Sequence, residues 1–115
     1  MPLHIKANDK AFDAYYADLA QLASVNVSHE QATRKAFQAL LDHFGRQVKW
    51  TLILEQRLPN GAIPDGTFRD LFLPHGYWEA KDTKDDLEAE IRKKIARGYP
   101  TGNIIFEDTR RAVLY

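Results

Sequence analysis

Residues 63–82 read IPDGTFRDLFLPHGYWEAKD, and this stretch decides the fold that we predict. The segments 67–73 and 77–81 are rich in aromatic and apolar residues, which indicates two strands. Pro74-His75-Gly76 lies between them and predicts the turn of a hairpin. Upstream, residues 47–58 largely alternate apolar with polar side chains and predict another strand with one buried face. Together the three strands should form an antiparallel meander.

Three segments begin with a polar residue that can cap a helix and continue with apolar residues at helical spacing. They run from Asn8 or Asp9 to about 23, from Ser28 to about Gly45, and from Thr83 to about Arg97. Residues 103–107 form a continuous apolar run typical of a strand buried on both faces, and 112–115 predict a last strand. This order predicts an α/β fold, a mixed central β-sheet flanked by helices, in which the third helix makes a crossover.

The central stretch also carries the candidate catalytic residues. Asp65 comes first, and Glu79-Ala80-Lys81 follows in the third predicted strand. Because alternate residues of a strand point to the same face, Glu79 and Lys81 should share one face. Two carboxylates can hold Mg²⁺, which prefers oxygen ligands and keeps several waters. An adjacent lysine could orient a water and stabilise charge on a phosphate, so the pattern predicts metal-dependent phosphodiester cleavage.

The identity of the first acid is open at this stage. Pro64-Asp65-Gly66 is also a turn sequence, with Asp and Gly at favoured positions. Asp70 is the rival of Asp65, because a hairpin that closes at His75-Gly76 would place Asp70 opposite Lys81. We expect His75 itself to be a turn residue rather than a metal ligand.

The helices offer further candidates, each with a simpler alternative. Glu30 projects onto the same stripe of its helix as Phe37 and could add a metal ligand. It could instead only favour the positive end of the helix dipole and pair with Arg34. Tyr99 is expected to pack, with a phosphate contact as the alternative. Three basic residues of the third helix could bind DNA phosphates or form a solvated basic end: Lys93, Lys94 and Arg97.

Composition excludes several classes of protein. The chain has no cysteine, so neither a disulfide framework nor a thiolate metal site is possible. No apolar run approaches a membrane span or a signal peptide, so we expect a cytoplasmic protein. The formal net charge is zero, whereas nucleic-acid binders usually carry a basic excess. Either the chain does not bind nucleic acid, or a larger assembly that contains it binds the nucleic acid. The apolar run at 112–115 favours a domain cut from a longer polypeptide.

The motif and the order of elements together resemble a known nuclease fold. An α-β-β-β-α-β arrangement with an acid near the second strand and Glu-x-Lys on the third resembles the core of the PD-(D/E)xK nuclease superfamily. Several stretches look like the Mrr-like nuclease domain at the amino end of type ISP restriction-modification enzymes: 76–82, 85–87, 90–91, 98–100 and 103–106. The resemblance covers residues 28–115, the expected nuclease core, and leaves 1–27 as an N-terminal helical extension.

This resemblance implies a magnesium-dependent endonuclease module that cleaves double-stranded DNA, with Mn²⁺ able to replace Mg²⁺. It implies metal ligation by Asp65, Glu79, the backbone carbonyl of Ala80 and the helix carboxylate Glu30, with Lys81 as the catalytic lysine. DNA binding and translocation would reside in a helicase-like motor, a methyltransferase and a target-recognition domain of the same polypeptide. Many relatives carry a glutamine beyond the lysine, and no glutamine follows Lys81 here.

Two other interpretations are compatible with the sequence. A domain of this fold without catalysis could position DNA or dock another protein, although Asp65, Glu79 and Lys81 are all present. An unrelated small α/β binding domain could also carry the motif by chance. We expect the isolated chain to be a monomer that self-associates only weakly.

Overall fold

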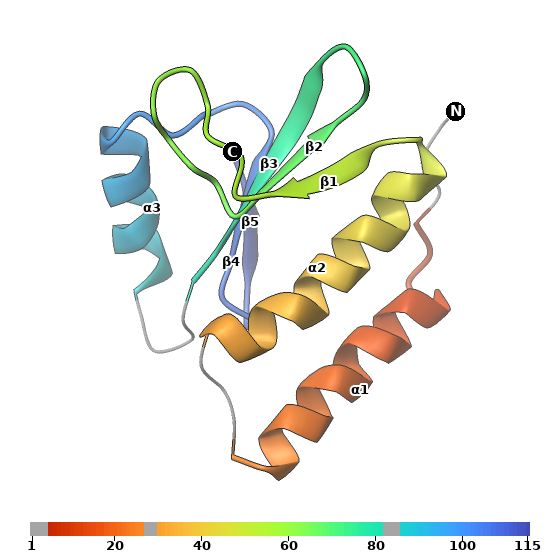
Figure 1. Ribbon diagram of the computed structural model, residues 1–115. Coiled ribbons are helices and arrows are strands. Elements are labelled where there is room, and N and C mark those ends of the chain that lie inside the picture. Colours follow the sequence, from red (N-terminus) through yellow and green to blue (C-terminus); the bar gives the residue numbers. More distant parts are fainter. Residues whose placement is uncertain (1–4, 27–29, 82–85) are drawn as a thin grey trace.

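The computed structural model describes residues 5–26, 30–81 and 86–115, with helices on both sides of one sheet (Figure 1). The helices are α1 (Lys10–Ser24), α2 (Glu30–Gln47) and α3 (Leu87–Ala96). The strands are β1 (Thr51–Leu54), β2 (Gly66–Arg69), β3 (Pro74–Ala80), β4 (Ile104–Glu107) and β5 (Ala112–Leu114). The predicted α/β fold, with a mixed sheet flanked by helices, is therefore confirmed.

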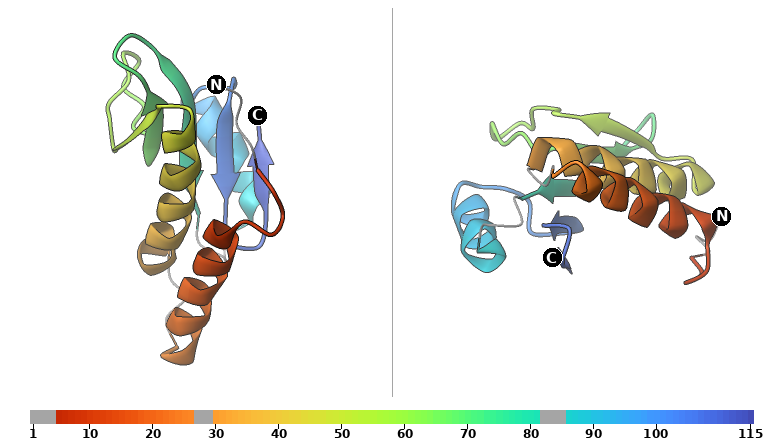
Figure 2. Two further views of the ribbon diagram at one scale, coloured as in Figure 1. Left: turned by 90° about the vertical axis from the view of Figure 1, so that its right-hand side faces the viewer. Right: turned by 90° about the horizontal axis from the view of Figure 1, so that it is seen from below.

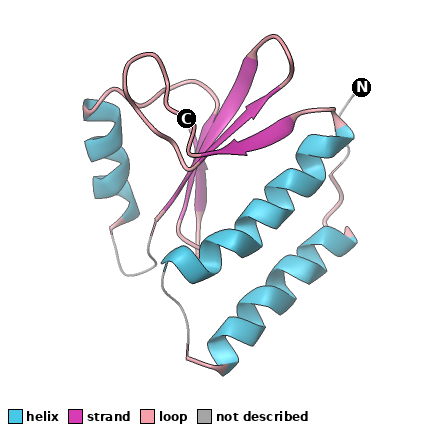
Figure 3. Cartoon of the chain, in the orientation of Figure 1, coloured by secondary structure: helices cyan, strands magenta, loops and turns pink. Residues whose placement is uncertain are grey.

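The sheet has the strand order β1-β2-β3-β4-β5. Its neighbouring strands are antiparallel except β3 and β4, which are parallel. Parallel strands need a crossover connection, and α3 provides it between β3 and β4 (Figure 3). No helix among the described residues is both long and apolar enough to cross a membrane.

The two faces of the sheet bury different cores. Helices α1 and α2 pack together on one side, and the Phe37 ring of α2 lies 6.0 Å from the ring of Trp78 in β3 (Figure 2). Helix α3 covers the other side, where its Leu87 and Ile91 pack against Ile104 and Phe106 of β4. Because Glu79 pairs in register with Phe106, it lies on the α3 side of the sheet.

The helix ends agree with the sequence in part. Asp9 caps α1 by accepting the Ala11 N–H at 2.9 Å, which decides between the two predicted caps. Helix α2 does not end at Gly45 but continues to Gln47. This glycine instead allows close packing, since a Cβ there would lie 2.6 Å from the Phe68 ring. The predicted cap Ser28 lies outside the described residues.

Helix α3 begins later than predicted. Its N-cap is Asp86, whose side chain accepts the N–H groups of Glu88 and Ala89. The predicted cap Thr83 lies outside the described residues. The helix ends at Ala96, as its end signal predicted, and Gly98 follows with a φ of +93°, a conformation that glycine adopts without strain.

The β2–β3 hairpin differs most from the prediction. Strand β1 is confined to Thr51–Leu54, and Pro74-His75-Gly76 belongs to β3 instead of forming the turn. The turn lies at 70–73, where the Asp70 carboxylate accepts the N–H groups of Phe72 and Leu73, both at 2.8 Å. An aspartate side chain can thus close a turn that needs neither proline nor glycine. Asp70 consequently lies at the hairpin tip, and its predicted position opposite Lys81 was wrong.

Candidate active site

Asp65 and Glu79 meet where β2 begins and β3 ends. Asp65 immediately precedes β2, and Glu79 is the last residue but one of β3. The backbone N–H of Asp65 donates to Glu79 Oε1 at 3.1 Å, and the N–H of Ala80 donates to Asp65 Oδ2 at 2.8 Å. These two hydrogen bonds hold the carboxylates side by side. The structure therefore brings together the two acids that the sequence suggested as metal ligands.

Three basic side chains surround this pair of acids. Lys94 Nζ lies 3.1 Å and Lys81 Nζ 3.4 Å from Glu79 Oε2. The guanidinium of Arg34, which comes from α2, lies 3.4 Å from Asp65 Oδ1. A buried charge is stable in a protein only when it is paired. Since the Glu79 side chain is only 5% exposed, these cations are what allow two acids to share the site.

Two further acids contact the basic side chains of the site. Glu90 Oε2 is 3.8 Å from Lys81 Nζ, and Glu55 Oε1 is 3.7 Å from the guanidinium of Arg34. Both contacts are long, and Glu55 is largely exposed, so its pair with Arg34 contributes little to stability. The positive charge of Arg34 and Lys81 is therefore directed mainly at Asp65 and Glu79.

The donor set suits a cation of the magnesium type. Mg²⁺ is commonly held by one or two carboxylates and completes its shell with waters and phosphate oxygens. Asp65 and Glu79 supply two such carboxylates, and Ala80 lies between Glu79 and Lys81 in the buried end of β3. Within 5–26, 30–81 and 86–115, no group of three or more acidic or histidine side chains could hold a metal. A metal held by Asp65 and Glu79 would accordingly keep several waters.

The other two predicted acids do not join this pair in the described part of the chain. Glu30 is the first residue of α2, but its side chain lies outside what the structure describes. Asp70 lies at the hairpin tip, where its Oδ2 is 2.9 Å from His75 Nε2. This contact with His75, with help from the Leu73 and Phe72 amides, lowers the pKa of Asp70 to about 2. Asp70 is therefore a turn-forming residue remote from Lys81.

The three basic residues of α3 have different surroundings. Lys93 is 63% exposed and pairs with Glu90 at 3.4 Å. Arg97 and Lys94 line a hollow of about 320 Å³ together with Tyr99. Of these three residues, only Lys94 contacts Glu79. Helical spacing could not predict this contact, because the contact depends on how α3 crosses the sheet.

A second buried carboxylate, Glu107, was missed by the sequence reasoning. It ends β4, pairs in register with Ala80 and is only 2% exposed. Burial raises the pKa of Glu107 to about 7, and the negative charges of Asp108 and Asp65 add to this rise, while the Thr109 amide and the Trp78 indole oppose it. A glutamate at the end of a continuous apolar strand was the signal that could have revealed it.

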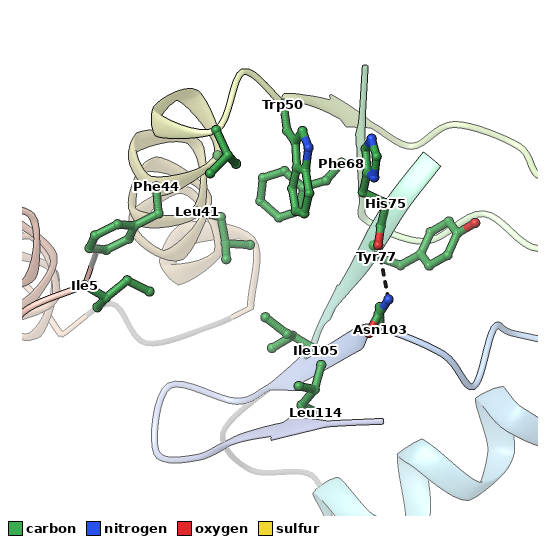
Figure 4. A pocket seen from close by; sticks show the side chains of 13 residues that line it. Ile5, Leu41, Phe44, Trp50, Phe68, His75, Tyr77, Asn103, Ile105 and Leu114 are labelled. Atoms are coloured by element: carbon green, nitrogen blue, oxygen red, sulfur yellow. Dashed lines mark hydrogen bonds between the residues drawn. The ribbon is translucent and has the colours of Figure 1, made fainter. Parts of the chain in front are cut away.

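A separate apolar pocket of about 350 Å³ lies between the end of α2 and the sheet (Figure 4). Leu41, Phe44 and Ile105 are among its lining residues. At its edge the rings of Trp50 and His75 stack with centroids 4.5 Å apart. His75 belongs to β3 and is not the turn residue predicted. None of the described lining residues is an acid, a lysine or an arginine. The candidate active site is therefore the one at Asp65 and Glu79, where acidic and basic side chains lie together.

The fold and the site together define a class of protein. It is an α/β domain with a mixed five-stranded sheet, in which a charge-compensated carboxylate pair lies where one strand begins and its antiparallel neighbour ends.

Comparison with solved structures identifies a relative of this chain. It is similar to a chain of the DrdV–DNA complex solved by cryo-electron microscopy, with 40% sequence identity and a TM-score of 0.85 over 91% of this chain and 78% of that one. At this identity and coverage, the chain belongs to the same protein family as that DrdV chain. No protein-family model matches the sequence, and no curated protein matches it.

Proposed function

We propose that this chain is a Mg²⁺-dependent DNA endonuclease module that hydrolyses phosphodiester bonds. The observation that carries the proposal is the hydrogen-bonded pair of Asp65 and Glu79 with Lys81 Nζ 3.4 Å from Glu79. DNA as the substrate is supported by the related DrdV chain, which was solved in complex with DNA. The resemblance to PD-(D/E)xK nucleases supports the same chemistry.

Each residue of the site has a role in this reaction. A divalent cation held by Asp65 and Glu79 would polarise the scissile phosphate and promote ionisation of a bound water. Lys81 can hold the attacking water or a phosphate oxygen through a charge-assisted hydrogen bond. Arg34 adds positive charge on the Asp65 side, where it can stabilise negative charge that develops on the phosphate. The Ala80 N–H fixes the Asp65 carboxylate, so that the ligands do not have to reorganise.

The formal net charge of zero leaves little general attraction for DNA. We therefore include in the proposal that other parts of the same polypeptide grip and move the DNA. The resemblance to type ISP enzymes suggests a helicase-like motor, a methyltransferase and a target-recognition domain for these tasks. The nuclease module would then cut DNA that is delivered to it.

The experiment that tests the proposal is cleavage of supercoiled plasmid by the chain in Mg²⁺, Mn²⁺ or EDTA. Wild type should nick the plasmid only with a divalent cation, and Asp65→Asn, Glu79→Gln and Lys81→Met should each lose the activity. Asp70→Asn is the matched control, because it neutralises an aspartate outside the site, and it should cut normally. Cleavage that persists in EDTA or in Glu79→Gln would contradict the proposal.

A second candidate function is DNA positioning or protein docking without catalysis. The observation that favours it is the hairpin tip, where Leu71 and Phe72 are 84% and 80% exposed. Large exposed apolar side chains in a row often mark an interaction site. DNA or protein binding by a wild type that never cuts would support this function instead of the nuclease.

A further inference from the structure

Two lysines contact the same oxygen of one carboxylate. Lys94 and Lys81 lie 3.1 and 3.4 Å from Glu79 Oε2, on the α3 side of the sheet. A divalent cation bound to this oxygen would place two more positive charges beside both ammonium groups. Like charges repel strongly at such distances in a partly buried site. A bound metal would therefore weaken the hold of this oxygen on at least one lysine.

Lys81 is slightly more buried than Lys94, whose side chain is 17% exposed. It directly follows β3, and its backbone N–H donates to the Glu107 carbonyl of β4 at 2.8 Å. Its side chain is only 11% exposed. The backbone of Lys81 is thus fixed by the sheet beside the two acids.

Lys94 already has a second partner that does not depend on Glu79. Its Nζ lies 4.7 Å from the centre of the Tyr99 ring and 3.4 Å from the Tyr99 hydroxyl oxygen. Tyr99 is itself anchored, because its hydroxyl donates to the Ile63 carbonyl at 3.1 Å. An aromatic face is a favourable site for an ammonium group. The hollow of about 320 Å³ lined by Lys94, Tyr99 and Arg97 gives the side chain room to move.

We propose that Lys94 is the exchangeable counter-ion of Glu79. It neutralises Glu79 when no metal is bound, and when a divalent cation takes the carboxylate it leaves Glu79 and keeps only its contact with Tyr99. The inference rests on the proposed function, because it takes Glu79 as a metal ligand. Burial alone would lower the pKa of Lys94, but Glu79 and Tyr99 raise it above the ordinary lysine value, so the side chain stays charged. Once released, this charge lies beside Arg97 and favours a phosphate in the hollow.

The test is Mn²⁺ binding to the chain, measured by isothermal titration calorimetry. Lys94→Met removes the competing cation, so it should bind Mn²⁺ on the order of tenfold more tightly than wild type. Lys93→Met is the matched control, because it makes the same change one residue away on the exposed side of α3, and its affinity should equal that of wild type.

Tyr99→Leu supplies a test of opposite sign. It removes the ring that receives the displaced lysine, so it should weaken Mn²⁺ binding by about threefold. In the double variant Lys94→Met/Tyr99→Leu this loss should vanish, because no lysine needs the ring. Thermal unfolding of each variant verifies that it is folded.

The outcomes separate this inference from the proposed function. Mn²⁺ binding that depends on Glu79 but is unchanged or weaker in Lys94→Met would overturn the role of Lys94 and leave the nuclease proposal intact. Wild type that binds Mn²⁺ no better than Glu79→Gln would overturn both.

Discussion

Glu79 and Glu107 are buried carboxylates on the neighbouring strands β3 and β4, one register step apart and on opposite faces of the sheet. Glu79 faces α3 and contacts the ammonium groups of Lys81 and Lys94. Glu107 faces α1 and α2, and it forms no ion pair with any residue that the structure describes. Its Oε2 accepts one backbone N–H, that of Thr109, at 2.9 Å.

The difference shows that burial alone does not make a metal site. Nearby cations stabilise the ionised form of a carboxylate, and only that form binds a divalent cation well. Without such cations, burial instead favours the protonated form, which is why the pKa of Glu107 is raised to about 7. Charge compensation thus separates the candidate catalytic acid from its neighbour.

The largest expected effect comes from replacing Glu79 with glutamine, and the same replacement of Glu107 is its control. Glu79→Gln should slow Mg²⁺-dependent plasmid nicking on the order of 100-fold or more, because it removes a metal ligand and leaves the developing charge unstabilised. Glu107→Gln is the same chemical change on the other face and should leave the nicking rate close to wild type. Equal losses in the two variants would break the comparison.

Glu107 should also make stability depend on pH. Its pKa rises from 4.5 to about 7 on folding, so the folded state retains the proton longer than the unfolded state. This stabilising contribution is complete below pH 4.5 and is lost as the pH rises to about 7. Glu107→Gln is neutral throughout, so its gain over wild type should grow to roughly 3 kcal/mol above that range.

Urea unfolding of wild type and Glu107→Gln at several pH values measures this gain. The two proteins should be nearly equal at the acidic end, and the variant should be the more stable at the alkaline end. A difference that is constant with pH, or a variant that is less stable in alkaline solution, would contradict the assignment.

Removing a cation from the site should lower stability, because less positive charge then lies beside the acids. Arg34→Met leaves Asp65 without its guanidinium and should cost about 1–3 kcal/mol of unfolding free energy near neutral pH. Arg46→Met is the control, because it breaks an exposed pair with Asp42 in the same helix and should cost below about 0.5 kcal/mol. Chemical denaturation compares the two, and equal costs would show that the site gains nothing from Arg34.

The smallest effect on function is expected from Asp70. Asp70→Ala removes the acceptor for the Phe72 and Leu73 amides and should lower stability only slightly. Nicking activity should be unchanged, because Asp70 lies at the far end of the hairpin from Lys81. A loss of activity comparable to that of Asp65→Asn would restore Asp70 as the first acid.

Local signals in the sequence predicted much of the fold. The Asp9 cap, the end of α3 before Gly98 and the apolar run of β4 depend on residues close together in the chain, and the structure has all three. The proximity of Asp65 and Glu79 followed from the pairing of adjacent strands. These features could be predicted because few distant contacts decide them.

The features that sequence reasoning missed depend on distant contacts. The Asp70 side chain, not Pro74 or Gly76, closes the hairpin, and Gly45 packs against Phe68 instead of ending α2. The contact of Lys94 with Glu79 depends on how α3 crosses the sheet. The raised pKa of Glu107 likewise depends on the helices that cover it.

The most direct test of the account is a titration of the ¹⁵N-labelled chain with Mn²⁺, followed by the broadening of its amide signals. Paramagnetic Mn²⁺ broadens the signals of nearby nuclei. The account predicts saturable broadening that is strongest at Asp65, Glu79 and Ala80 and is lost in Glu79→Gln. Broadening centred on Asp70 and His75 at the hairpin tip, or no saturable broadening at all, would contradict it.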